Sequence, residues 1–184
     1  KYLSDILKDN RIDPITYLNE KLFNPVGMNH SLVEVDPSGY MAGSSYAYCS
    51  ALDWMRFGIL HLNNGMWDGN QILSPKWVNY VSTPTPSCDS TAYGAHFWLN
   101  ASFQEDGSDR RWKDLPRDVF FPSGHAGQHI FIIPSMDLVI MRLGNASDKK
   151  AWSESNFLRD MLQPFQRPDT SYVVEQNSIQ QISL

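Results

Sequence analysis

The 184 residues of the chain are enough for about one domain with a buried core, because domains commonly run to roughly 150 residues. Apolar residues make up 42% of the sequence, which excludes an intrinsically disordered chain and a collagen-like repeat. The formal charge is -5 and the basic residues form no cluster, so the sequence lacks the basic surface of a nucleic-acid binder and no nucleic-acid partner is expected.

The amino-terminal half of the sequence is predicted to be helical. In three places a capping residue precedes apolar residues at helical spacing. These signals predict a helix over residues 14–23 that stops before Pro25, a helix from Ser50 to about Asn64 that is apolar around most of its circumference, and a shorter helix that starts at Pro75 and ends before Pro84.

The periodicity changes after residue 92. Short stretches rich in aromatic and β-favouring residues predict strands over residues 93–99 and 119–121, separated by a charged surface loop over residues 101–118. Residues 130–133 and 137–143 are apolar and flank a Pro-Ser-Met segment, which predicts an antiparallel hairpin with a tight turn.

The carboxy-terminal part begins with a further amphipathic helix, expected over residues 151–163. Residues 164–184 are rich in Gln and Ser and are expected to form a tail. Helices first and hairpin strands later indicate an α+β fold, with residues 1–163 in one domain.

Several classes of function lack their motif. The sequence contains no Gly-x-Ser-x-Gly elbow, no phosphate-binding loop, no dinucleotide-binding glycine motif and no His-Glu-x-x-His. Apart from His125 and His129, which are expected to face opposite ways across a turn, the histidines lack metal-ligand spacing, so neither a metal nor a cofactor is expected. The longest apolar runs, residues 130–134 and 138–141, are far shorter than the roughly 20 residues of a membrane helix.

The first ten residues and the two cysteines bear on processing and compartment. Residues 1–10 mix charged with apolar side chains and do not begin with Met, so they do not read as a signal peptide, and we expect the true amino terminus to lie upstream. Cys49 and Cys88 can form one disulfide at most, and neither belongs to a redox or zinc motif. The compartment stays undecided on these residues.

The segment from Ser123 to Gln128 (SGHAGQ) leads directly into the predicted hairpin and combines small residues with a histidine. Gly124 and Gly127 allow a ligand to approach the backbone closely, and His125 places a group that titrates near neutral pH beside them. On their own these residues fit a glycine-rich turn with a surface imidazole as well as a binding or catalytic site.

Four segments resemble motifs of one superfamily. Residues 22–28 (LFNPVGM) are similar to an lfePLGM signature, residues 50–58 (SALDWMRFG) to an SarDlaRFG helix, residues 93–98 (YGAHFW) to a YGyGWW strand, and residues 124–144 to GHgGQ...ivPeldLVvvrlg. On these motifs the chain resembles the carboxy-terminal half of the class C-like serine β-lactamase and penicillin-binding-protein superfamily, in the branch of esterases and 6-aminohexanoate-dimer hydrolases. The resemblance implies a partial β-lactamase/transpeptidase-like fold, with antiparallel strands flanked by helices and the amino-terminal part missing.

The resemblance also implies a site. The superfamily uses a Ser-x-x-Lys nucleophile pair, a Tyr-x-Asn proton relay, and a Lys-Thr-Gly or His-x-Gly on the strand that edges the site. By resemblance His125 and Gly127 belong to that His-x-Gly, where His125 would donate a hydrogen bond or assist electrostatically, and Gln128 would contribute a backbone N–H to the oxyanion hole. Because imidazole is neutral over much of the physiological range, His125 favours substrates other than carboxylate-bearing β-lactams.

Two segments spell the other motifs in the wrong place. Residues 147–150 (SDKK) read as Ser-x-x-Lys, but they follow the His-x-Gly strand and are better explained as the cap of the next helix. Tyr17 and Asn19 spell Tyr-x-Asn only a few residues before the PVGM signature, whereas the relay of the family lies about thirty residues before it. We therefore expect the nucleophile and the relay to lie upstream of Lys1.

Three aromatic residues are candidates for contact with a substrate. Tyr46 and Tyr48 precede a helix predicted to be buried, so they either line the substrate cleft or belong to the core and its rim. Trp112 stands in the charged loop, which is expected to be a solvated excursion but could also shape substrate access.

Two functions remain open. The first is the carboxy-terminal portion of a serine hydrolase that cleaves amide, ester or β-lactam bonds of a small molecule through an acyl-enzyme, with the chain alone inactive. The second is a non-catalytic ligand- or peptidoglycan-binding module of the same fold. A sheet that lacks part of its strands exposes an edge, through which a homo-oligomer is expected. The resemblance favours a periplasmic or secreted location without deciding it.

Overall fold

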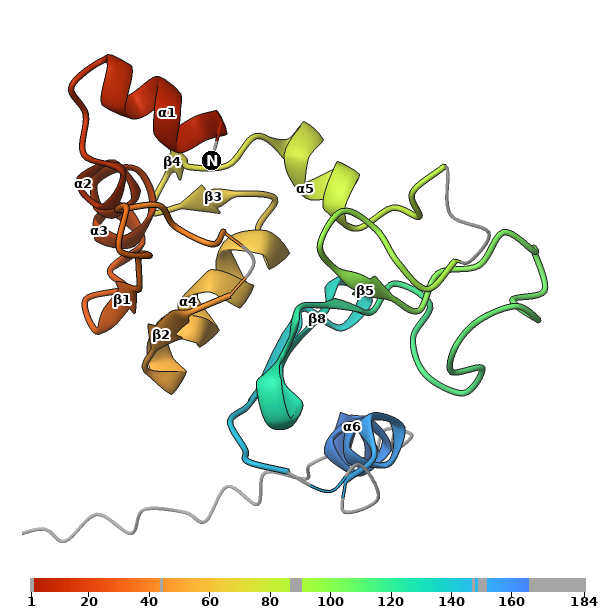
Figure 1. Cartoon of the computed structure of the whole chain (residues 1–184). Coiled ribbons are helices and arrows are strands. Elements are labelled where there is room, and N and C mark those ends of the chain that lie inside the picture. The colour runs from red at the N-terminus through yellow and green to blue at the C-terminus, as the bar shows by residue number, and fades with distance from the viewer. Residues whose placement is uncertain (1, 44, 87–90, 147, 149–151, 166–184) are drawn as a thin grey trace, which may run out of the picture.

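A computed structural model describes residues 2–43, 45–86, 91–146, 148 and 152–165 of the chain. Helices fill most of the first half, and the larger sheet follows them (Figure 1), which confirms the predicted α+β fold. In chain order the elements are α1 (Tyr2–Asp9), α2 (Pro14–Leu18), the π-helix η1 (Asn19–Phe23), α3 (Asn24–Val26), β1 (Ser31–Val33), β2 (Ala47–Cys49), α4 (Ala51–Leu62), β3 (Met66–Trp67), β4 (Asn70–Gln71), α5 (Pro75–Val81), β5 (Trp98–Leu99), β6 (Phe120–Phe121), β7 (Ser123–Gly124), the 3-10 turn η2 (His125–Gly127), β8 (Gln128–Ile133), the 3-10 turn η3 (Pro134–Met136), β9 (Leu138–Arg142), α6 (Glu154–Leu162) and the 3-10 turn η4 (Gln163–Phe165).

The larger sheet has the strand order β5-β6-β8-β7, with β9 also paired with β8. β6 and β7 follow one another along the same side of β8, where Phe120 lies opposite Ile132 and Gly124 lies opposite Gln128. β8 and β9 form the predicted antiparallel hairpin, and η3 is its tight turn. Two small hairpins, β1 with β2 and β3 with β4, lie outside this sheet.

Alternation along the strands directs successive side chains to two different helices. Phe121 and Phe131 pack with Leu158 of α6, whereas Phe120 and Ile130 pack in a second cluster that includes side chains of α4. Figure 1 shows the strands between these two helices. The strands β6 and β8 are therefore buried on both faces.

The helix α4 approaches the sheet closely at Gly58. A Cβ atom at this position would lie 2.6 Å from Val139 Cγ1 and 2.8 Å from Ile130 Cγ2. Those distances are too short for any side chain, so glycine is required where the helix crosses the β8–β9 hairpin.

The start of α4 contains a buried carboxylate. Ser50 caps the helix as predicted, since its Oγ accepts the N–H of Asp53 at 3.1 Å. The carboxylate of Asp53 accepts hydrogen bonds from the His30 N–H (2.7 Å), the Ser31 hydroxyl (3.1 Å) and Arg56 (3.0 Å). Burial raises the pKa of Asp53, but these hydrogen bonds outweigh it and hold the pKa below its ordinary value. Asp53 thereby joins β1 to the first turn of α4.

Three helix predictions need correction. The helix expected over residues 14–23 continues through η1 and α3 to Val26, and Gly27, with φ 74°, ends it. Pro25 does not stop it, because the wider π turn comes before the proline. The predicted burial of α4 on most sides fails at Leu52, which is 59% exposed. The last helix begins at Glu154 with Ser153 as its cap.

Most of the strand predicted over residues 93–99 is a tight turn instead. The Gly94 N–H donates to the Phe97 carbonyl at 2.8 Å, and Tyr93 forms a bridge with Trp98. His96 has a φ of 69° in this turn. A positive φ explains why glycine is common at this position of the similar motif, because glycine adopts it at no steric cost.

The charged loop over residues 101–118 is partly buried, contrary to the expected solvated excursion. Trp112 and Leu115 lie in the core cluster that also contains Leu158 and Leu162 of α6. Asn100 is fully buried and closes the loop: its Nδ2 donates to the carbonyls of Trp112 and Pro116, each at 2.9 Å, and its Oδ1 accepts the Trp112 N–H at 2.7 Å. The loop therefore folds around one asparagine side chain.

Within the described residues β9 has only β8 as a strand neighbour, so its outer edge is open there. An open strand edge favours pairing with another strand, and association through this edge stays a prediction. None of the helices in the described ranges has the length and apolar character needed to cross a membrane.

Candidate functional site

The His-x-Gly segment forms the three-residue turn between β7 and β8 instead of lying on a strand. Ala126 (φ 57°) and Gly127 (φ 81°) are both left-handed, which costs alanine roughly 1 kcal/mol. The His125 side chain is exposed, and Gln128 is half-buried at the start of β8. The segment is therefore a turn and not part of a strand, which corrects the conformation that the resemblance implied.

Strand register determines which backbone groups of this turn are available. Ile130 donates to the Pro122 carbonyl at 3.4 Å, and hydrogen-bonding pairs alternate along an antiparallel ladder, so the next such pair is Gly124 with Gln128. The backbone groups of Gln128 therefore face Gly124. The carbonyl of Gly124 faces β8, so the N–H on the same trans peptide, that of His125, points to the opposite side of β7. Among the described residues no strand covers that side.

A pocket of about 660 Å³ opens beside the turn. Gly127 and Ser123 form one side of it, and the start of α6 forms another. Two of the predicted site residues, Gly127 and Trp112, line this pocket together. Its lining comprises Arg111, Trp112, Ser123, Gly127, His129, Ala146, Asp148, Trp152, Ser153, Glu154 and Ser155.

Three side chains in this pocket have the composition of a serine, histidine and acid triad but not its geometry. His129 is buried, and its Nε2 lies 3.1 Å from Ser123 Oγ and 3.0 Å from Glu154 Oε1. In a triad the serine and the acid contact different ring nitrogens, so that one nitrogen accepts the serine proton. Here both contact Nε2, and Nδ1 has no hydrogen-bond partner among the residues that the structure describes. The arrangement therefore lacks the two-nitrogen relay by which a triad activates its serine.

Glu154 connects two walls of the pocket, because its carboxylate contacts both His129 and Arg111. Burial raises the pKa of its carboxyl, but the hydrogen bond with His129 and the positive charge of Arg111 outweigh burial and hold the pKa below its ordinary value. The guanidinium of Arg111 lies over the Trp98 and Trp112 rings at 5.3 and 5.1 Å. Sequence reasoning missed His129 and Glu154 because they are 25 residues apart and belong to no motif.

The two tyrosines predicted to line the cleft lie elsewhere. Tyr46 borders a separate hollow of about 410 Å³, whose other lining residues lie at positions 34–36 and 40–42. Tyr48, on β2, is 50% exposed and lies opposite Leu32 of β1, without lining either hollow. Their proposed contact with substrate therefore depends on a surface other than the pocket beside the turn.

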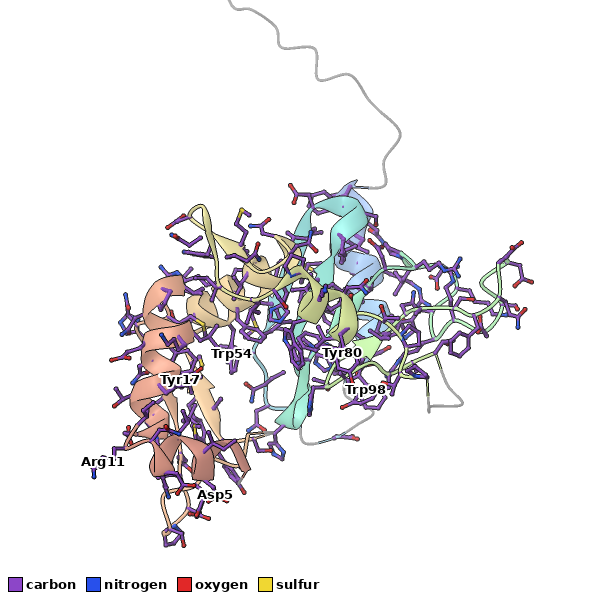
Figure 2. The ribbon with its side chains drawn as sticks, turned by 90° about the horizontal axis from the view of Figure 1, so that it is seen from above. Asp5, Arg11, Tyr17, Trp54, Tyr80 and Trp98 are labelled. Atoms are coloured by element: carbon purple, nitrogen blue, oxygen red, sulfur yellow. The ribbon has the colours of Figure 1, made fainter. Side chains whose placement is uncertain are left out.

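The remaining candidates are placed as follows. Tyr17 lies in α2 (Figure 2) and Asn19 in η1, and neither lines the pocket. Asp148 does line it, whereas the other residues of the Ser-x-x-Lys-like segment, at 147, 149 and 150, lie outside the described residues. Burial raises the pKa of the Cys49 thiol, and its possible disulfide partner Cys88 also lies outside the described residues. The described ranges contain no group of three His, Cys, Asp or Glu side chains that could hold a metal ion.

The sequence is similar to a known protein at low identity. No family model matches the sequence. An uncharacterized protein of Alkalihalophilus pseudofirmus is 27% identical over 135 residues, which cover 65% of this chain and 39% of the relative. The chain therefore spans well under half the length of that curated relative.

Three solved structures match the fold. A protein of Bacillus anthracis assigned as a 6-aminohexanoate-dimer hydrolase has a TM-score of 0.65 and 22% identity, covering 83% of this chain and 39% of that one. A β-lactamase of Mycobacterium bovis has a TM-score of 0.58 and 17% identity, covering 79% and 53%. A protein of Bacteroides dorei assigned as a β-lactamase has a TM-score of 0.52 and 20% identity, covering 73% and 45%.

The chain therefore has a β-lactamase-like hydrolase fold, as its motifs predicted. It corresponds to 39% to 53% of the length of these three structures. At these identities the likeness establishes the fold, and the chemistry has to be argued from the site.

Proposed function

We propose that the chain is the carboxy-terminal part of a serine hydrolase that acts by acyl transfer on amide, ester or β-lactam bonds of a small molecule. A serine of an upstream Ser-x-x-Lys attacks the carbonyl carbon, and an upstream Tyr-x-Asn passes its proton to the leaving group. Water then hydrolyses the acyl-enzyme. The observation that carries the proposal is the His-x-Gly turn at the end of β7, next to the side of β7 that no described strand covers, within a β-lactamase-like fold.

In this proposal the tetrahedral oxyanion lies against the uncovered side of β7. The register supports the His125 N–H as its donor, in place of Gln128, whose N–H faces Gly124. A backbone N–H held by a hairpin stabilises developing negative charge without reorganising during the reaction. The exposed His125 imidazole is then free to donate a hydrogen bond to the substrate.

The pocket beside the turn provides room for part of the substrate. Its volume of about 660 Å³ lies within the range of small-molecule sites. Gly127 has no side chain, so a substrate can approach its backbone closely, and Trp112 contributes an aromatic edge to the pocket wall. We expect the part of the substrate flanking the scissile bond to enter this pocket.

The first test is turnover. We expect the full-length protein to hydrolyse p-nitrophenyl acetate, and the 184-residue chain to be inactive because the proposed nucleophile lies upstream of it. Absorbance of released nitrophenolate measures both, with nitrocefin as a parallel substrate. If the chain alone hydrolyses a substrate and Ser123→Ala or Ser147→Ala abolishes that activity, the proposal that the nucleophile lies upstream is wrong. A folded full-length protein that binds ligands but hydrolyses neither substrate would support the binding-module alternative.

A second test addresses the imidazole of His125. In the full-length protein, His125→Ala is expected to slow acylation by about tenfold to a thousandfold, the range for loss of one group that stabilises the oxyanion side of the site. Stopped-flow measurement of the acylation burst reports this step. His30→Ala is the matched control, because His30 is also exposed and its N–H contact with Asp53 survives the substitution. Equal acylation rates for His125→Ala and wild type would show that the His125 imidazole has no role in acylation.

A further inference from the structure

Arg142, the last residue of β9, reaches the His-x-Gly turn with its side chain. Its Nη1 donates a hydrogen bond to the Gly127 carbonyl, and its guanidinium lies 4.3 Å from the centre of the Trp152 ring. Arg142 is also the strand partner of His129, the buried histidine of the pocket. One side chain thus contacts the turn and a wall of the adjoining pocket.

Glycines make space for this guanidinium on both sides. A Cβ atom at Gly127 would lie 3.0 Å from Arg142 Nη1, and a Cβ atom at Gly144 would lie 2.3 Å from the same atom. A side chain at position 144 would therefore displace the guanidinium, whereas one at position 127 would require only a small shift of it. The observed position of the guanidinium thus depends most on Gly144.

The turn needs external support because it contains two consecutive left-handed residues, one of which is Ala126. Two contacts come from the segment after β8: the Ala146 N–H donates to the Ala126 carbonyl at 2.9 Å, and Arg142 donates to the Gly127 carbonyl. The Gly127 carbonyl and the Gln128 N–H belong to one peptide plane and point in opposite directions. Holding this carbonyl therefore keeps the Gln128 N–H directed at Gly124, which preserves the ladder that orients the His125 N–H.

We propose that Arg142 is a positioning residue that holds the His-x-Gly turn in its left-handed conformation. Its effect on catalysis rests on the proposed function, whereas its effect on the conformation of the turn does not. A charge-assisted hydrogen bond to a carbonyl combined with stacking on a tryptophan is a role for which lysine is a poor substitute, because lysine lacks the planar donor fork.

The conformational test is amide hydrogen exchange of the 184-residue chain, resolved by residue. Arg142→Met keeps the aliphatic stem and removes the guanidinium, and we expect the Gln128 amide to exchange about tenfold to a hundredfold faster, as for loss of a hydrogen bond to a charged group. Arg142→Lys should give an intermediate rate. Arg11→Met is the matched control, because Arg11 projects from the outside of the amino-terminal helices (Figure 2). Exchange within twofold of wild type in both Arg142 variants would overturn the proposal.

The kinetic test uses the full-length protein. We expect Arg142→Met to lower kcat for p-nitrophenyl acetate at least about tenfold with little change in KM, because the turn acts on the transition state more than on ground-state binding. An unchanged kcat in an active enzyme would refute the positioning role. A third outcome separates the two proposals. If the wild-type full-length protein hydrolyses no substrate but the Gln128 amide still exchanges faster in Arg142→Met, the proposed function is refuted and the conformational role of Arg142 stands.

Discussion

Replacing Asp53 with alanine is expected to lower the free energy of unfolding by about 3 kcal/mol. The substitution leaves the His30 N–H and the Ser31 hydroxyl without their acceptor inside the protein. It also removes the partner of Arg56, but the Arg56 side chain is 29% exposed and can turn to water, so the expected loss is at the lower end for a broken buried pair. Urea denaturation measures the change. Asp9→Ala, at an exposed position of α1, should change the stability by less than about 0.5 kcal/mol.

The contribution of Asp53 should depend on pH in a defined direction. Its pKa in the folded chain lies below the ordinary value of 3.8, so the folded state binds the proton more weakly than the unfolded state does. The stabilisation is therefore fully present above that ordinary value and is lost as the pH falls through the folded-state pKa. We expect the stability difference between wild type and Asp53→Asn to be constant near neutral pH and to shrink below about pH 4. A difference that grows on acidification would contradict this assignment.

Replacing Gly58 with alanine is expected to destabilise the chain by about 2 kcal/mol, although alanine is the better helix former. Higher helix propensity contributes roughly 1 kcal/mol in favour of alanine. The new Cβ atom would collide with Val139 and Ile130, and overpacking of a dense core costs about 1 to 3 kcal/mol. We expect a cost of about 3 kcal/mol here, because both neighbours are β-branched and rigid. Thermal or urea unfolding of the variant measures the net effect.

A double-mutant cycle isolates this collision. Val139→Ala removes the methyl group nearest to the new Cβ atom and on its own creates a small cavity. If the helix and the hairpin really meet at Gly58, the double variant should be more stable than the sum of the two single effects predicts, by about 1 kcal/mol or more. Additive effects would show that α4 does not approach the hairpin as closely as the structure indicates.

The elements predicted best from the sequence have local and redundant signals. The β8–β9 hairpin has continuous apolar strands and a proline-containing turn, and α4 has a capping serine followed by apolar residues, so both predictions are confirmed nearly to their ends. The strand expected at residues 93–99 failed because a left-handed residue, His96, closes a turn inside an aromatic segment. Glycine, asparagine and aspartate are the residues that most clearly indicate such a turn in a sequence, and histidine is a weaker indicator.

The candidate site was predicted in part. The residues around His125 were recognised from small residues and a motif, which are local features. The contacts of Arg142 with Gly127 and of Glu154 with His129 join positions 15 and 25 residues apart, and neither pair repeats at a helical or strand period. Trp112 was placed in a charged loop, and its burial follows from Asn100, whose side chain satisfies three backbone groups of that loop. Such contacts arise from tertiary structure and leave no periodic pattern.

The central claim is that the nucleophile of this hydrolase fold precedes the residues of this chain, and covalent labelling tests it most directly. The full-length protein is treated with a fluorophosphonate, a reagent that phosphonylates activated serines, digested, and mapped by mass spectrometry. We predict one labelled serine, in a Ser-x-x-Lys upstream of Lys1, and no label on Ser123 or Ser147. A label on either of these two serines, or a folded full-length protein that takes up no label, would contradict the account.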